Sequence, residues 1–152
     1  MKLAEALILR ADSQKKISQL RQRLSRSAKV QEGEQPPENP QELLAELESA
    51  LADLTSMIQR INKTNSNTEL AGGTLSDALA QRDTLGTKRS VLDGLIQEAA
   101  ITQNRYSRSE VRFVSTVDIA DLQRQVDTAS QEHRLLDAQI QSLNWQVELM
   151  DA

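Results

Sequence analysis

Only one residue is of the kind most often used as a general base: the chain's single histidine, His133, with Glu132 beside it and Asp137 one helical turn later. An imidazole next to carboxylates can relay a proton. However, the sequence shows no serine, cysteine or second histidine in a pattern that His133 could activate. A histidine on the apolar seam of a helix is therefore the favoured interpretation, and we predict no catalytic residues.

Metal and cofactor chemistry lack their usual sequence patterns. The chain has no cysteine, which excludes thiolate ligands and disulfides. Di-iron helical bundles use Glu-x-x-His on two helices, and the residue three before His133 is Ser130. No glycine-rich phosphate loop follows a strand. We expect no metal and no cofactor.

The stretch RYSRSEVRFVSTVD, residues 105–118, carries the one cluster of side chains suited to an anion. Arginine binds phosphate and carboxylate groups through a planar fork of donors, and neighbouring hydroxyls add to such a site. The candidate binding residues are Arg105, Tyr106, Arg108, Glu110 and Arg112. A structural alternative is that the arginines pair with the chain's own acidic connector, which contains Glu32, Glu34 and Glu38.

Charge is segregated along the first third of the chain. Seven basic residues and only Asp12 as an acid lie between Arg10 and Lys29, and seven acids without a base lie between Glu32 and Asp53. An antiparallel helical hairpin would place the two segments side by side, where their charges largely neutralise each other. With a net charge of −4 and 2% aromatic residues, we expect no nucleic-acid binding.

Apolar residues recur in steps of three and four, which predicts long helices. Helices are expected over about 3–30, 41–65, 75–102 and 118–150, joined by connectors 31–40, 66–74 and 103–117. Gly33 and the prolines end the first helix, Asn39 caps the second, Gly72 and Gly73 form a turn, and Asp118 caps the fourth.

The apolar seams define how the helices are expected to pack. In the second helix the predicted seam is Leu44, Leu47, Leu51, Leu54, Ile58 and Ile61. In the fourth it is Ile119, Leu122, Val126, Ala129, His133, Leu136, Ile140, Leu143, Val147 and Met150. Because short connectors make successive helices antiparallel, the predicted fold is all-α. It is an antiparallel four-helix bundle, or a set of coiled-coil-like helical hairpins, forming a single helical domain over 1–152. The first and third connectors are expected at one end.

The third connector shows a different period. Val111, Phe113, Ser115 and Val117 alternate with Glu110, Arg112, Val114 and Thr116, which is the two-residue repeat of an extended chain. We therefore predict a short β-strand between the third and fourth helices. Its expected partner is the segment around residues 28–31, or the same strand of another subunit.

A second stripe lies on the back of the fourth helix. Leu135, Ala138, Ser142, Trp145 and Leu149 repeat in steps of three and four on the side opposite the seam. Apolar residues aligned on a surface favour a protein contact, so Leu135, Trp145 and Leu149 are the candidate oligomer interface of a homo-oligomer. Alternatively, the first helix covers this stripe within the monomer.

No segment approaches about 18 consecutive apolar residues, and the start MKLAEALILRAD lacks a small-residue cleavage pattern. We expect a cytoplasmic protein without a membrane partner.

Several stretches together resemble one family of small bacterial proteins that carries the label septicolysin. They are MKLAEALILRAD, AKVQEGEQPPENPQELL, INKTN, RYSRSEVRFVSTVD and LNWQVEL, and the similarity covers nearly the whole chain. The resemblance implies a helical protein of bacterial origin, and it provides no catalytic residues to assign. Its label suggests a membrane-active cytolysin.

The leading functional hypothesis is a non-enzymatic, oligomer-forming helical protein with a structural or interaction role. The first alternative is a small-ligand or anion binder that uses residues 105–112. The second alternative is the cytolysin that the family label suggests.

Overall fold

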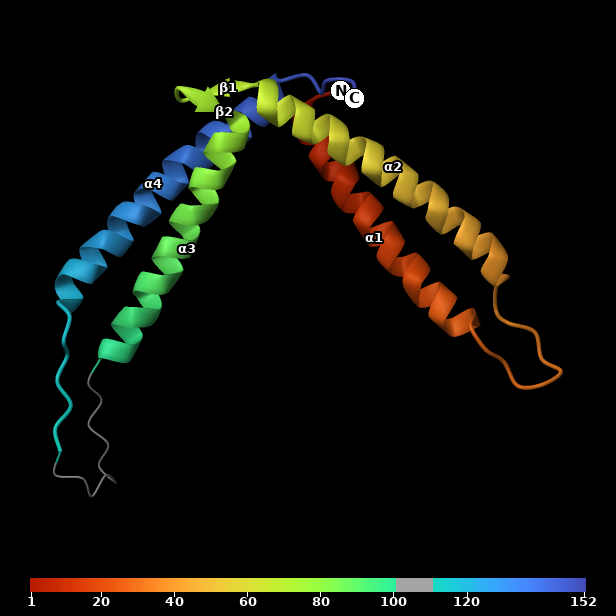
Figure 1. Cartoon of the computed structure of the whole chain (residues 1–152), viewed down its shortest axis with the longest axis horizontal. Coiled ribbons are helices and arrows are strands. Elements are labelled where there is room, and N and C mark those ends of the chain that lie inside the picture. Colours follow the sequence, from red (N-terminus) through yellow and green to blue (C-terminus); the bar gives the residue numbers. More distant parts are fainter. Residues whose placement is uncertain (101–110) are drawn as a thin grey trace. The chain divides into compact units, whose positions relative to one another are not determined.

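The computed structural model describes residues 1–100 and 111–152, and this part of the chain is all-α, as the sequence predicted. Its helices are α1 (Leu3–Ser27), α2 (Pro40–Asn67), α3 (Leu75–Ala99) and α4 (Ile119–Gln146). A two-stranded antiparallel sheet, β1 (Glu69–Leu70) and β2 (Gly73–Thr74), lies between α2 and α3 (Figure 1). In this part of the chain no helix is long and apolar enough to cross a bilayer.

The chain divides into two compact units. The first contains residues 1–75 and 141–152, hence α1, α2, the small sheet and the C-terminal segment. The second contains residues 76–140, hence most of α3 and α4. The expectation of a single domain with the first and third connectors at one end stays a prediction.

Local signals place the helix ends close to where the sequence predicted them. The side chain of Asn39 accepts a hydrogen bond from the Gln41 amide at 2.9 Å, and Pro40 occupies the first turn of α2. Asp118 caps α4 by accepting from the Asp121 amide at 3.1 Å. Gly33 has a φ of 87° in the connector between α1 and α2, a conformation that favours glycine.

Helices α1 and α2 lie side by side as a hairpin with a narrow apolar seam (Figure 1). In the connector half, Leu20, Leu43 and Ala50 are buried, and three half-buried side chains pack against them: Ile17, Leu24 and Leu47. Buried and half-buried residues continue the seam in steps of three and four. In α1 these are 3, 6, 10, 13, 17, 20, 24 and 27; in α2 they are 43, 47, 50, 54, 57, 61 and 64.

The observed α2 seam corrects the predicted one. Leu43 and Ala50 face α1, whereas Leu44 and Leu51, which were expected in the seam, are exposed. Both series have the same three-four spacing, so periodicity alone did not choose between them. The small Ala50 side chain lets the two helices approach closely, and this favours the series that contains it.

A tight turn joins α2 to α3. Ala71 and Gly72 both have positive φ, 53° and 82°, as in the primed two-residue turns that close β-hairpins. Glu69 pairs with Thr74 and Leu70 with Gly73. The sequence predicted a turn at Gly72, but not the short strands on either side of it.

The C-terminal residues pair with the N-terminal ones instead of extending α4 to residue 150. Lys2 and Glu148 form an antiparallel bridge. The Leu3 amide donates to Val147 O at 2.9 Å, and the Leu149 amide donates to Met1 O at 2.8 Å. The Val147 amide still donates to Leu143 O at 3.0 Å, but the Val147 carbonyl and the Leu149 amide bind the N-terminal residues instead of continuing the helix, and α4 ends at Gln146.

In the second unit, α3 and α4 run antiparallel. Arg82 binds Asp137, and Gly86, one turn further along α3, lies against His133, one turn earlier in α4. The predicted α4 seam is confirmed between residues 122 and 140: Leu122, Val126, Ala129, Leu136 and Ile140 are buried.

The predicted β-strand over 111–117 is wrong. These residues are irregular, and no strand of the described chain pairs with them. A strand needs a partner for its backbone groups, and here a side chain takes that role locally: Ser115 Oγ donates to Val117 O at 2.8 Å and accepts from the Val117 amide at 3.3 Å. The alternation of residue types was not enough to predict a strand, because it carries no information about a pairing partner.

Candidate functional site

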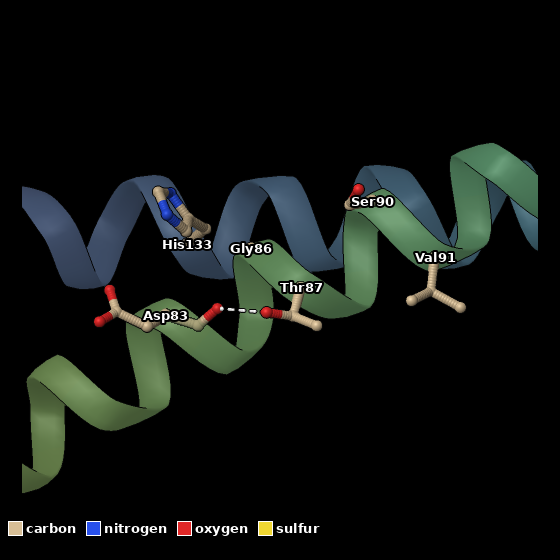
Figure 2. Close-up of a pocket in the computed structure, with 6 residues that line it drawn as sticks. All are labelled: Asp83, Gly86, Thr87, Ser90, Val91 and His133. Carbon is tan, nitrogen blue, oxygen red and sulfur yellow. Dashed lines mark hydrogen bonds between the residues drawn. The ribbon is translucent and has the colours of Figure 1, made fainter.

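A hollow lies beside His133, the residue that the sequence analysis considered as a general base. It has a volume of about 490 Å³ and opens to solvent between α3 and α4 (Figure 2). His133 is on α4, and the remaining lining residues are on α3: Asp83, Gly86, Thr87, Ser90 and Val91. His133 is half-buried at its predicted seam position. Gly86 leaves room for the imidazole, because a Cβ there would meet its Cδ2 and Nε2 at 3.8 Å.

Two polar residues that line this hollow, Asp83 and Thr87, have hydrogen-bond partners within the chain. Arg82 donates to Asp83 Oδ1 at 3.1 Å and to Asp137 Oδ1 at 3.0 Å, so both carboxylates are paired with a guanidinium. Burial lowers the pKa of Arg82, the hydrogen bonds that Arg82 donates to Asp83 and Asp137 raise it, and the net shift is upward. The Thr87 hydroxyl donates to the Asp83 main-chain oxygen at 3.2 Å (Figure 2).

This geometry does not form an acid-base pair or a metal site. Asp137, which the sequence placed one turn from His133, binds Arg82 instead. Within residues 1–100 and 111–152, no three His, Asp or Glu residues gather in a way that could hold a metal ion.

Most of the predicted anion-binding cluster lies outside the described residues: Arg105, Tyr106, Arg108 and Glu110. Arg112 is described and exposed, between Val111 and Phe113. Glu38, which the structural alternative offered as a partner for these arginines, is bound by Arg23. The anion-binding alternative stays a prediction.

The three residues of the predicted oligomer interface are in different environments. Leu135 and Trp145 are each 56% exposed. Leu149 is only 8% exposed, in the C-terminal segment that pairs with the N-terminal residues. Leu149 is thus used within the chain, and Leu135 and Trp145 remain available to a partner.

The α1–α2 hairpin has a charged flank. Arg23 donates to Glu38 from Nη2 to Oε1 at 2.6 Å, and from Nε to Oε2 at 2.9 Å and to Oε1 at 3.2 Å. Glu46 forms ion pairs with Lys16 at 3.6 Å and with Arg23 at 4.0 Å. This juxtaposition of the basic and acidic segments is the one that the sequence predicted. Lys16, Arg23 and Glu46 each immediately precede a seam residue, so they lie on one side of the seam.

The opposite flank of α2 is apolar. Leu44, Leu51 and Ile58 each immediately follow a seam residue, which turns them away from the ion pairs. We call these three residues the outer stripe. Leu44 is 42% exposed, Leu51 is 38% exposed and Ile58 is half-buried. The sequence analysis noticed these residues but assigned them to the seam, so their role as a surface was missed.

The described residues therefore define a helical protein whose α1–α2 hairpin has a charged flank and an apolar outer stripe. The chain belongs to a family of unknown function, DUF6847, whose model matches residues 10–149. Over 99% of both chains it is similar to the crystal structure of a functionally unknown conserved protein from Corynebacterium diphtheriae, with 48% identity and a TM-score of 0.92. None of the curated proteins matches it.

These matches correct the resemblance drawn from the sequence. The family is DUF6847, and neither match carries the septicolysin label. The assignment to septicolysin was wrong, and the cytolysin hypothesis that depended on this label has no remaining support.

Proposed function

We propose that this protein is a non-enzymatic helical interaction protein that associates with itself. The observation that supports this proposal is the outer stripe of α2. Its large aliphatic side chains follow one another at intervals of seven residues, and Leu44 and Leu51 are exposed while Ile58 is half-buried, beside a seam that is already filled.

The physical reason to expect self-association is the width of the apolar face of α2. In a two-helix hairpin, only the narrow seam between the helices is covered. In α2 the outer stripe widens this apolar face on one side, and ion pairs cover the other side. Contact with another helix would remove the exposed leucines from water, at about 25 cal/mol per Å² of apolar surface. Aligned exposed apolar side chains of this kind are typical of interaction surfaces.

Leu135 and Trp145 offer further apolar surface for association. A large exposed tryptophan is a residue type enriched at protein interfaces. We propose Leu135 and Trp145 as a second contact. Leu149 is not part of it, because that side chain is buried.

The test is the molar mass of the protein measured by light scattering over a dilution series. We expect the mass to rise above that of the 16.9 kDa chain as concentration increases. Leu51→Lys should return it towards the monomer, because the ammonium group cannot be buried without a partner. A matched control is Val91→Lys, at an exposed position of α3, which should keep the wild-type mass.

Circular dichroism should show that all three proteins keep their helix content. A wild-type protein that stays monomeric up to several hundred micromolar would refute self-association altogether. A mass that rises equally in wild type and Leu51→Lys would move association to another surface.

A further inference from the structure

The last residues of the chain dock on a surface built by the start of the chain and the end of α2. Lys2 forms an antiparallel bridge with Glu148, and its Nζ lies 2.6 Å from Glu148 Oε1. Arg60 donates to Met150 O at 3.2 Å and to Asp151 Oδ1 at 3.2 Å. We call residues 147–151 the docked segment. We call the residues that hold it the acceptor surface: Met1, Lys2, Leu3, Arg60 and Thr64.

The contact selects its own segment by backbone, charge and burial together. Two main-chain bonds join residues 1–3 to residues 147–149, and the two acids of the docked segment pair with two bases of the acceptor surface. Leu149 is buried, and so is Thr64, which accepts from the Met150 amide. Extended peptides are bound in this way, with main-chain bonds for affinity and side chains for specificity. A second copy of this chain carries a segment with the same match.

The turn between α2 and α3 lies between the acceptor surface and the docked segment along the chain. Ala71 in this turn has a φ of 53°, and no other non-glycine residue of the described chain has a positive φ. The Cβ of an alanine makes this conformation unfavourable. Opening the turn relieves that strain and breaks the pairing of β1 with β2, which is two residues long. Short connections under strain favour the exchange of an element between copies.

We propose that two copies of this chain exchange their docked segments, so that residues 147–151 of each copy lie on the acceptor surface of the other. Every contact of the docked segment is then repeated between the copies, and the reciprocal exchange closes at two chains. The inference goes beyond the outer stripe, because the surfaces that meet are already matched within one chain.

Exchange is slow and depends on protein concentration. In a single chain the docked segment has a high effective concentration at its own acceptor surface, so dilute protein keeps its own segment. The segment must also leave that surface before another copy can take its place. We therefore expect exchange in concentrated protein that is warmed and cooled again, and not in samples kept cold.

Cysteine pairing across the bridge tests the exchange, because the chain has no cysteine. Facing residues of an antiparallel pair have Cα atoms about 4.5–5.5 Å apart, which a disulfide can span. Lys2→Cys and Glu148→Cys are purified separately, mixed at high concentration, warmed, cooled and oxidised. A covalent dimer with one chain of each should form, in several-fold higher yield than in a mixture of Lys2→Cys with Val91→Cys, an exposed position of α3. A yield no higher than this control would overturn the exchange.

The double variant Lys2→Cys/Glu148→Cys shows whether the two thiols can pair. Oxidised when dilute, it should form a disulfide within one chain. Oxidised after warming at high concentration, part of it should become a covalent dimer. A disulfide confined to single chains under both conditions would contradict the exchange, with thiols that are known to meet.

Substitutions in the turn should change the yield of the mixed dimer in opposite directions. Asparagine tolerates the left-handed conformation better than alanine, so Ala71→Asn should lower the yield. Valine is strongly disfavoured at the φ of 82° that Gly72 has, so Gly72→Val should raise it. Circular dichroism checks that both variants keep their helices. Equal yields with the natural turn and with both variants would overturn the role of the turn.

Leu51→Lys separates this inference from the proposed function. Added to both single-cysteine variants, it should leave the yield of the mixed dimer unchanged, because Leu51 belongs neither to the acceptor surface nor to the docked segment. A yield that falls with Leu51→Lys would attribute the crosslink to association through the outer stripe and would overturn the exchange. A mixed dimer that persists, while unwarmed wild type keeps the monomer mass by light scattering, would support the exchange and refute the outer stripe.

Discussion

The Arg23 guanidinium holds the Glu38 carboxylate through Nη2 at 2.6 Å and Nε at 2.9 Å, and so joins α1 to the connector that precedes α2. This hydrogen bond, more than the charge of Arg23, lowers the pKa of Glu38 below 4.5. A carboxylate whose pKa is lower in the folded than in the unfolded state adds stability above its unfolded pKa. That contribution is lost as the pH falls through the folded value.

Arg23→Gln should therefore lower the urea midpoint at pH 7, and its difference from wild type should shrink as the pH falls below 4.5. Arg21→Gln, at an exposed position of α1, is the matched control and should leave the pH dependence unchanged. The measurement is urea unfolding followed by circular dichroism between pH 7 and pH 3. A difference that persists undiminished at pH 3 would contradict a role for the Glu38 carboxylate.

Thr64 attaches the C-terminal segment to α2. Its buried Oγ1 donates to Arg60 O at 2.8 Å and accepts from the Met150 amide at 3.0 Å. Thr64→Val keeps the shape but leaves that amide without a partner, so we expect a loss of roughly 1–2 kcal/mol in the free energy of unfolding.

Hydrogen exchange at the Met150 amide should also become faster in Thr64→Val. Thr128→Val is the control, because the exposed Thr128 hydroxyl only donates to Arg124 O within its own helix at 3.0 Å. The control should change stability by less than about 0.5 kcal/mol. Equal effects of the two substitutions would mean that the Met150 bond contributes nothing.

Replacing either of two glycines inside α3 with alanine should change the free energy of unfolding in the same direction. A Cβ at position 86 would meet the His133 imidazole at 3.8 Å, which is ordinary van der Waals contact, and a Cβ at position 94 would meet nothing within 4 Å. Gly86→Ala and Gly94→Ala should each raise the free energy of unfolding by roughly 0.5–1 kcal/mol, because alanine loses less backbone entropy in a helix.

Urea unfolding of both alanine variants measures this gain. Gly86→Leu should instead destabilise the protein, because the longer side chain reaches the imidazole. Destabilisation by Gly86→Ala, with stabilisation by Gly94→Ala, would show that α3 and α4 pack more tightly at this point than the structure indicates.

Substitution of Trp145 tests the second proposed contact. Trp145→Glu should lower the average mass at high protein concentration without loss of helicity, because a carboxylate cannot be buried unpaired in an apolar contact. Combined with Leu51→Lys it should yield a monomer at every concentration. Light scattering measures both, and an unchanged mass in Trp145→Glu would assign self-association to the outer stripe alone.

Local signals made the helix boundaries predictable. Proline and a capping asparagine act on the residues beside them, so Asn39 and Pro40 marked the start of α2 without reference to the rest of the fold. The pairing of the basic and acidic segments was predictable for a related reason. A short connector forces an antiparallel hairpin, and it brings Glu38, near the end of the connector, back beside Arg23 on α1.

The errors came where a pattern needed a partner from elsewhere in the chain. The alternating residues 111–117 suited a strand, but within residues 1–100 and 111–152 they form no strand and join no sheet. The four residues after Gln146 continued a helical pattern, yet main-chain bonds to Met1 and Leu3 drew them into an extended segment. Such bonds join residues far apart in sequence, and residue periodicity contains no information about them.

The sequence by itself determined that the chain is helical, where its helices begin, and that its first two helices pair through opposite charges. These properties follow from short-range backbone preferences and from charge. Only the tertiary structure decided which of two equally spaced series on α2 is buried, because that depends on the face of α2 that packs against α1, where Leu43 and Ala50 are buried with Leu20. The choice left Leu44 and Leu51 exposed, and the interaction surface proposed for this protein is built on them.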